Sequence, residues 1–340
     1  MRRLGPFTTL GAALAVGALL LCAAMYAAGT NPIEGFSALV EGALGGRNQI
    51  GETLVATTAL LFPALGITLA FRAGLFNIGA EGQLIIGALF AGAIGPQLHL
   101  PPLLGIVVLF ACGALGGFIW GGIAGWMKAR MQANEVISTL MLNFIAGYVA
   151  LYLAGGPLRG PVASGAETAW LPNGYWLPPL IAHTRLSVGI VVALCVAAAL
   201  QFVLSRTVFG FELRATGEAP EAARRNGISI ARITLLSLAV SGAIAGMGGA
   251  AIVTGELHRF NTQLSPGYGF TAIAVALVGN LQPLWVCVAA FGFGILEAGG
   301  LSMQASVGVP KDAVHIIEGL IIFILAARRY VASRNGAVAA

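Results

Sequence analysis

The sequence contains little charge. Only 9% of its 340 residues are Asp, Glu, Lys or Arg, whereas 58% are hydrophobic and the mean hydropathy is +0.88. An ordinary soluble domain carries about 25% charged residues. Such a soluble domain is therefore excluded, and the composition predicts an integral membrane protein.

Lysine is nearly absent, since Lys128 and Lys311 are the only two. No GxxxxGK[ST] motif occurs, so the chain has no phosphate-binding loop of its own for ATP. The net charge is +5, but the basic residues are spread between apolar runs and form no patch of the kind that binds nucleic acid. We expect neither ATP hydrolysis nor a nucleic-acid partner.

The residues that usually hold metals or carry out catalysis are also few. Each of the four cysteines lies alone in an apolar run, as expected of small buried side chains. His315 and Glu318, three residues apart, are the one weak candidate for a metal pair. No Ser, His and Asp arrangement can be discerned, so we expect no enzyme, no metal site and no cofactor in this chain.

Glycine, in contrast, is abundant, with 48 residues that lie mainly inside the apolar runs. In one run a glycine recurs every four residues, at Gly113, Gly117, Gly121 and Gly125. Gly242, Gly246 and Ala250 repeat this spacing in a later run. Small residues at this spacing allow two helix backbones to approach closely in a membrane, so both stripes predict helix packing.

The apolar runs predict about ten membrane spans, since a helix needs about 20 apolar residues to cross a bilayer. The runs lie near 8–28, 53–71, 82–98, 103–127, 136–154, 186–205, 230–254, 267–281, 284–301 and 313–327. The third and eighth are short and flanked by polar or Gly- and Pro-containing stretches, which is typical of broken or re-entrant helices. Arg2 and Arg3 before the first run also fit a signal peptide, but the later spans favour an uncleaved helix.

The basic residues predict the orientation. With ten spans and the N-terminus inside, 13 of the 18 Lys and Arg residues fall inside and five outside, as the positive-inside rule requires. The predicted fold is therefore an all-α integral membrane bundle, one polytopic domain over 1–340, with both termini inside. Glu135 is expected at the inner surface beside Lys128 and Arg130.

The longest inner loop, 206–231, contains a short capped helix. Pro220 suits a first helical turn, Glu221 lies where the helix dipole favours a carboxylate, and Gly227 suits the C-terminal end. From the residues alone, this segment is equally well explained as a solvated surface helix of the loop, whose arginines only follow the positive-inside rule.

Four segments carry a family resemblance. GLFNIGAEGQLIIGA (74–88), NEVISTLMLNFIA (134–146), ELRATGEAPEAARRNGI (212–228) and SPGYGFTAIAVALVGN (265–280) resemble, in order, signatures of the branched-chain amino acid, ribose and nucleoside permeases of ABC importers. The match is nearest to the nucleoside or simple-sugar branch. GNLQPL at 279–284 lacks a basic residue common there, and Glu318 stands where glutamine is common, so the substrate stays open.

The resemblance implies a transport subunit in a bacterial inner membrane that imports nucleosides, or else simple sugars such as ribose. It implies a second homologous permease chain, an ATPase with two nucleotide sites that binds ATP and Mg²⁺, and an external substrate-binding protein. The EAAxxxG segment resembles the helix that couples such permeases to their ATPase. Its residues are Glu221, Ala222, Ala223, Arg224, Arg225 and Gly227.

The stretch GLFNIGAEGQ, 74–83, lies between two apolar runs and contains polar residues and three glycines. We interpret it as a wall of the substrate pathway, formed by Phe76, Asn77, Glu81 and Gln83, because an amide both donates and accepts hydrogen bonds and a ring offers a stacking face. The alternative is a structural hinge whose polar residues cap broken helix ends. A third possibility is a proton-coupled transporter that uses Glu81 and Glu318 as relays.

Overall fold

The computed structural model describes residues 19, 22, 25–26, 30–310 and 319. Across these residues the chain is helical, with α-helices α2 to α12, two isolated β-bridges and no β-strand. The prediction of an all-helical protein is confirmed for this part of the chain. The predicted spans near 8–28 and 313–327, both termini, His315 and Glu318 lie almost wholly outside the described residues.

Six described helices are long and apolar enough to cross a membrane, and they coincide with six of the predicted spans. They are α3 (Arg47–Arg72), α5 (Pro102–Met131), α6 (Glu135–Gly155), α7 (Gly189–Arg206), α10 with the π-helical turn that ends it (Ile230–Leu257), and α12 (Pro283–Val307). The protein is thus a multi-pass membrane protein.

Two further predicted spans are short helices. α4 (Ala80–Ile94) has 15 residues and α11 (Tyr268–Val278) has 11. At about 1.5 Å per residue, neither helix reaches the roughly 30 Å of a bilayer core. The expectation that the third and eighth segments are too short to cross alone is confirmed.

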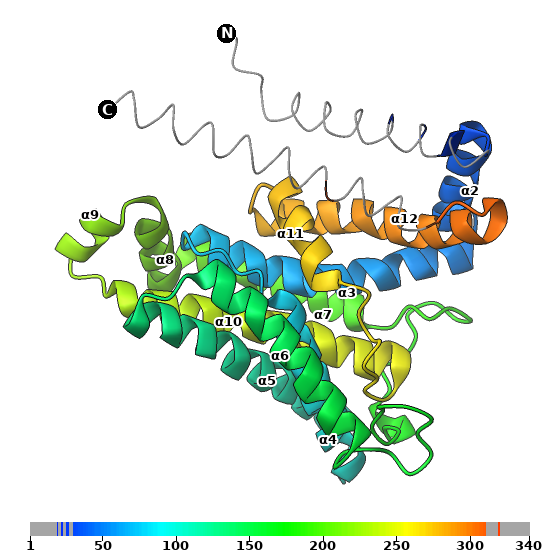
Figure 1. The fold of residues 1–340 in the computed structure, drawn as a ribbon, viewed down its shortest axis with the longest axis horizontal. Helices are drawn as coiled ribbons and strands as arrows, with labels where there is room; N and C mark the ends of the chain where they lie inside the picture. The colour runs from blue at the N-terminus through cyan, green and yellow to red at the C-terminus, as the bar shows by residue number, and fades with distance from the viewer. Residues whose placement is uncertain (1–18, 20–21, 23–24, 27–29, 311–318, 320–340) are drawn as a thin grey trace. The chain divides into compact units, whose positions relative to one another are not determined.

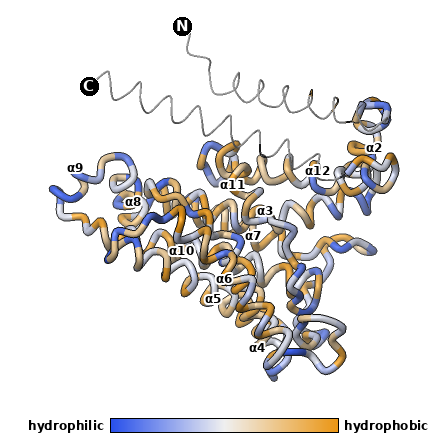
Figure 2. The backbone as a smooth tube through the Cα atoms, viewed as in Figure 1, coloured by the Kyte–Doolittle hydropathy of each residue, from blue (hydrophilic) through white to orange (hydrophobic). Residues whose placement is uncertain are grey.

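Three helices lie outside the predicted spans. α2 (Pro32–Leu44) was not predicted; it begins after Asn31, whose side chain accepts a hydrogen bond from the Ile33 amide. α8 (Val208–Glu218) and α9 (Pro220–Arg225) divide the long inner loop into two short helices. Figure 2 shows hydrophilic residues gathered on α8 and α9, in contrast to the apolar helices around them.

The chain divides into two compact units. The first combines Met1–Ala56 with Phe291–Ala340, and the second is Thr57–Ala290. In the first unit α2 and the end of α12 are in close contact, since a side chain at Gly42 would overlap Ser302 and one at Gly299 would overlap Leu39. The prediction of one polytopic domain stays a prediction.

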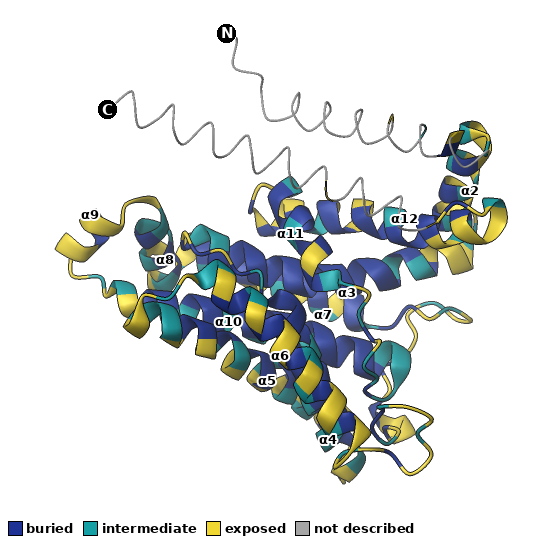
Figure 3. Cartoon of the chain, in the orientation of Figure 1, coloured by how far each residue is buried: buried dark blue, intermediate teal, exposed yellow. Residues whose placement is uncertain are grey.

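The core of the second unit is α10, which packs against α5 and α4 (Figure 1). The two predicted glycine stripes face each other: a side chain at Gly117 would overlap the Gly242 carbonyl, and one at Gly246 would overlap the Gly113 carbonyl. The packing role of both stripes is confirmed. Figure 3 shows α10 largely buried, whereas α5 and α6 keep exposed faces.

Candidate functional site

The predicted pathway stretch forms an irregular loop between α3 and α4, followed by the first turn of α4. Residues 73–79 are not helical, and Gly74 has a φ of +74°, which favours glycine. In a membrane protein such backbone must find partners within the protein. The contacts of this loop therefore decide what it can do.

α6 supplies several of these partners. The Asn143 side chain accepts from the Gly82 amide at 2.8 Å and donates to the Ile78 carbonyl at 2.9 Å, and the Ile78 amide donates to the Thr139 hydroxyl at 3.3 Å. Thr139 and Asn143 are four residues apart, so they share one helix face. Sequence reasoning missed both residues, although two polar side chains on one face of an apolar span are a usable signal.

Asn77 is fully buried and bonded to protein on every side. Its amide nitrogen donates to Gln83 Oε1 at 2.9 Å and to Ser241 Oγ at 2.8 Å. Its oxygen accepts from the Gly79 amide at 2.9 Å and from Gln83 Nε2 at 3.2 Å. In this conformation Asn77 joins the loop to α4 and α10, as the hinge alternative requires. Substrate contact by Asn77 and Gln83 stays a prediction.

Phe76 is the exception among the predicted pathway residues. Its side chain is 55% exposed, whereas Asn77, Glu81 and Gln83 are buried. The ring lies against Phe71, with 5.0 Å between the centroids and a tilt of 55°. Of the four residues, Phe76 is the one whose side chain is exposed on this chain, and its contact with a solute stays a prediction.

Glu81 joins the beginnings of the two short helices. The residue lies in the first turn of α4, and its Oε2 accepts a hydrogen bond of 2.7 Å from the Gly269 amide in the first turn of α11. The Ser265 hydroxyl also hydrogen-bonds to this carboxyl group. A carboxylate at a helix N-terminus is stabilised by the helix dipole. Two of the four family-like segments, 74–88 and 265–280, thus meet at Glu81.

The predicted coupling helix is α9. It ends as predicted, because Gly227 has a φ of +83° and the Ile228 amide returns to the Ala223 carbonyl at 3.1 Å. Glu221, Ala222, Arg224, Arg225 and Gly227 are exposed. Ala223 is only 3% exposed, so it packs against the protein itself, at the wall of a groove. Coupling by these residues stays a prediction.

A groove lies between α8 and α9, at one end of the second unit (Figure 1). Its volume is about 500 Å³, and its apolar wall includes Val208 and Phe211, both well exposed. Glu212, Glu218 and Asn226 also line it. Sequence reasoning missed Val208 and Phe211, although two large apolar residues in a polar loop are a signal for an interface.

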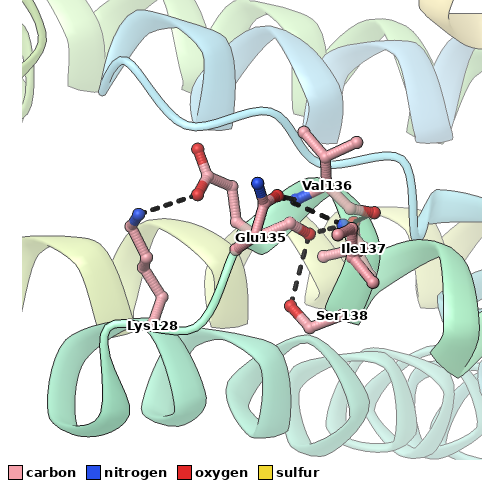
Figure 4. A network of polar contacts seen from close by, with 7 residues as sticks. Lys128, Glu135, Val136, Ile137 and Ser138 are labelled. Carbon is pink, nitrogen blue, oxygen red and sulfur yellow. Dashed lines mark hydrogen bonds and ion pairs between the residues drawn. The ribbon is translucent and has the colours of Figure 1, made fainter.

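The prediction that Glu135 lies beside Lys128 is confirmed, whereas its place at the inner surface stays a prediction. Lys128, near the end of α5, forms an ion pair of 2.9 Å with Glu135 at the start of α6 (Figure 4). Arg130 follows in the same last turn of α5. Lys128 and Arg130 were both assigned to the inner surface, so the structure brings Glu135 to that group of basic residues.

Comparison with known proteins agrees with the resemblance. The family model for the "Branched-chain amino acid transport system / permease component" matches residues 49–326, most of the chain. The guanosine ABC transporter permease protein NupP of Bacillus subtilis is 35% identical over 317 residues, which cover 92% of this chain and 90% of NupP.

Two further relatives differ in the solute that their names give. The glucose ABC transporter permease protein TsgB13 of Haloferax volcanii is 34% identical over 330 residues, 94% of this chain and 86% of that protein. The nucleoside ABC transporter permease protein NupB of Lactococcus lactis is 32% identical over 328 residues, 93% of this chain and 89% of that protein. The chain belongs to the family of branched-chain amino acid transport system permease components, and it is a membrane-spanning permease subunit of an ABC transporter.

Proposed function

We propose that this subunit forms part of the pathway by which an ATP-driven importer takes up nucleosides. The observation that carries the proposal is that two of the three relatives described above are named as a guanosine permease, NupP, and a nucleoside permease, NupB, and match more than nine-tenths of the chain. The exposed ring of Phe76 adds a surface on which a base can stack.

A simple sugar is the second candidate for the solute. The glucose permease TsgB13 is 34% identical, which is as similar as the two nucleoside permeases. Overall sequence identity therefore does not distinguish nucleosides from sugars as the solute. Transport measurements are needed to distinguish them.

We infer that the importer contains a second, homologous permease chain. The relatives occur as pairs in one organism, NupP with NupQ and NupB with NupC, and this chain is 28% identical to NupQ and 27% identical to NupC. An ATPase with two nucleotide sites would bind ATP and Mg²⁺, and an external binding protein would deliver the solute. We assign no cofactor to this chain itself.

The proposed topology has ten membrane segments, two of which are the short helices α4 and α11, with both termini inside and with α8 and α9 in the cytoplasm of a bacterial cell. The clustering of basic residues supports this topology. Lys128 at the end of α5 and Arg224 of α9 line one pocket, so both lie on the same side of the membrane. The positive-inside rule assigns that side to the cytoplasm.

The groove between α8 and α9 is the proposed docking surface for the ATPase. Its exposed Val208 and Phe211 would be covered by an apolar side chain of the partner. Large apolar and aromatic residues at the centre of an interface commonly provide most of its binding free energy.

The test is transport by the complete importer, with both permeases, the ATPase and the binding protein in liposomes. Guanosine uptake that requires ATP, continues with an uncoupler and exceeds ribose and glucose uptake supports the proposal. Sugar uptake in its place would change the solute but keep the class. Uptake that an uncoupler abolishes while ATP is plentiful would support a proton-coupled carrier that uses Glu81.

A further inference from the structure

A second pocket, distinct from the α8–α9 groove, lies within the second unit where α5 ends and α10 begins. Its volume is about 400 Å³. The polar side chains that line it come from three elements: Lys128 and Gln132 from the end of α5, Arg224 from α9, and Ser229 and Thr234 from the start of α10. The pocket therefore combines two cationic side chains with groups that donate hydrogen bonds.

Thr234 has no partner that explains its burial. It is only 6% exposed, it lines the pocket, and its hydroxyl has no hydrogen-bond partner among the described residues. The hydroxyl is therefore open to the pocket, where it can donate a hydrogen bond to a ligand.

The first turn of α10 adds further donors. Ser229 is the N-cap of this 23-residue helix, but its side chain makes no capping hydrogen bond. Ile230 and Ala231 also line the pocket, and the backbone amides of the first turn of a helix have no intrahelical acceptor. The N-terminus of a helix attracts an anion through these amides and through the helix dipole.

Two carboxylates near the pocket limit its positive charge. Glu135 pairs with Lys128 at 2.9 Å (Figure 4), and Glu221 lies 3.8 Å from Arg224 on the surface of α9. Neither acid lines the pocket. A lysine has three donors and an arginine five, so both cations keep donors for a ligand.

We propose that this pocket binds a phosphate group. A phosphate accepts several hydrogen bonds and suits arginine in particular, and the pocket offers Arg224, Lys128, Thr234 and the amides of α10 together. Two sources share this chemistry: the headgroup of an anionic phospholipid, or a small soluble phosphate compound. Because α5 and α10 are membrane spans, their ends lie at the level of lipid headgroups, which favours the lipid.

A bound phosphate would connect the coupling segment to the bundle. Arg224 belongs to α9, whereas Thr234 and Lys128 belong to membrane spans. A ligand held by all three would restrain α9 relative to α5 and α10. This consequence for coupling rests on the proposed function, but the binding itself does not.

The experiment measures binding without transport. The intact purified importer is titrated in detergent with dioctanoyl phosphatidylglycerol, with dioctanoylglycerol, which has the same chains but no phosphate, and with inorganic phosphate. Native mass spectrometry counts the bound lipid, and calorimetry follows inorganic phosphate. Arg224→Gln is compared with Arg225→Gln, which removes the same charge from the neighbouring residue that does not line the pocket. Thr234→Val removes only the hydroxyl.

Phosphatidylglycerol should bind wild type and Arg225→Gln alike, and dioctanoylglycerol should bind neither. Arg224→Gln should weaken binding about tenfold and Thr234→Val about threefold, because a charged hydrogen bond contributes more than a neutral one. If inorganic phosphate binds with the same dependence on Arg224 and Thr234, the ligand is a soluble phosphate compound. Equal binding to the Arg224 and Arg225 variants, or binding that needs no phosphate, would overturn the proposal, whatever solute the importer carries.

Discussion

Two segments interrupt the apolar helices of the second unit: the loop 73–79 before α4, and the pair α8 and α9. The loop has one polar side chain, Asn77, whereas α8 and α9 have several, and both segments were candidate sites from the sequence. In the loop, the side chain of Asn77 is fully buried and makes four hydrogen bonds to protein groups. In α8 and α9, Phe211 and Arg224 are exposed beside open pockets.

The difference separates two uses of polar and irregular segments in a membrane protein. A buried side chain whose polar atoms are bonded to protein, such as Asn77, holds helices at fixed positions, and a solute can reach it only after a conformational change. An exposed segment beside open pockets presents a surface to partners. Substitutions should therefore act on stability in the loop and on assembly in α8 and α9.

The largest effect is expected from Asn77→Leu. The substitution leaves Gln83, Ser241 and the Gly79 amide without their partner. Each loss costs about 1–3 kcal/mol where nothing compensates, and somewhat less in a membrane. We expect a loss of roughly 3 kcal/mol of unfolding free energy, seen as a lower midpoint of thermal unfolding in detergent.

The matched control for this loss is Asn226→Leu. Asn226 is exposed on the coupling segment, and its side chain bonds only the Ala222 carbonyl, at 2.8 Å. Its replacement should leave the unfolding midpoint nearly unchanged. Equal midpoints for the two variants would show that the buried network does not stabilise the protein.

Phe211→Ala should weaken assembly with the ATPase and leave the stability of the chain nearly unchanged. The side chain is 60% exposed, so stability should hardly change. At the centre of an interface, an aromatic residue typically contributes about 2 kcal/mol, which corresponds to about 30-fold in affinity. We expect that loss in the affinity for the ATPase, measured by co-purification at graded concentrations. The control is Leu103→Ala, because Leu103 is an exposed apolar residue at the start of α5 and does not line the groove. An equal loss of ATPase affinity in both variants would count against docking in the α8–α9 groove.

Much of this contrast could not be read from the sequence. The hydrophobic runs predicted the positions of six long helices and two short ones, because helix formation and length depend on local pattern. The hydrogen bond of Asn77 to Ser241 and that of Glu81 to Gly269 depend on contacts between segments far apart in the chain. A single sequence carries no signal that pairs them.

The distinction between local patterns and long-range contacts also explains which features of the coupling segment could be predicted. Pro220 and Gly227 mark the ends of α9 locally, so its bounds were nearly predicted. That Ala223 faces inward depends on how α9 packs on its neighbours. The unpredicted α2 is a 13-residue helix, too short for a search that looked only for spans.

Glu81 offers a smaller and sharper test within the buried region. Glu81→Gln keeps an oxygen that accepts the Gly269 hydrogen bond, and Glu81→Leu removes it. A hydrogen bond that is lost in a buried site costs about 1–3 kcal/mol, so the Leu variant should have a clearly lower midpoint of thermal unfolding than the Gln variant, and the Gln variant should keep most of its transport. Uptake abolished by Gln, with normal stability and ATPase content, would indicate that the carboxyl carries a proton.

Phe76→Ala should have the smallest effect, and it connects the two regions. Phe76 belongs to the loop by sequence but is exposed like the coupling segment, so its loss should leave the unfolding midpoint unchanged. Stacking of an aromatic pair is worth about 1 kcal/mol, so we expect about a fivefold fall in guanosine uptake at low concentration. Phe202→Ala, equally exposed on α7, should leave uptake unchanged. If Phe76→Ala lowers stability and not uptake, then the whole loop is structural and the solute contacts other residues. If it lowers uptake alone, one exposed ring beside the buried Asn77 suffices to contact the solute.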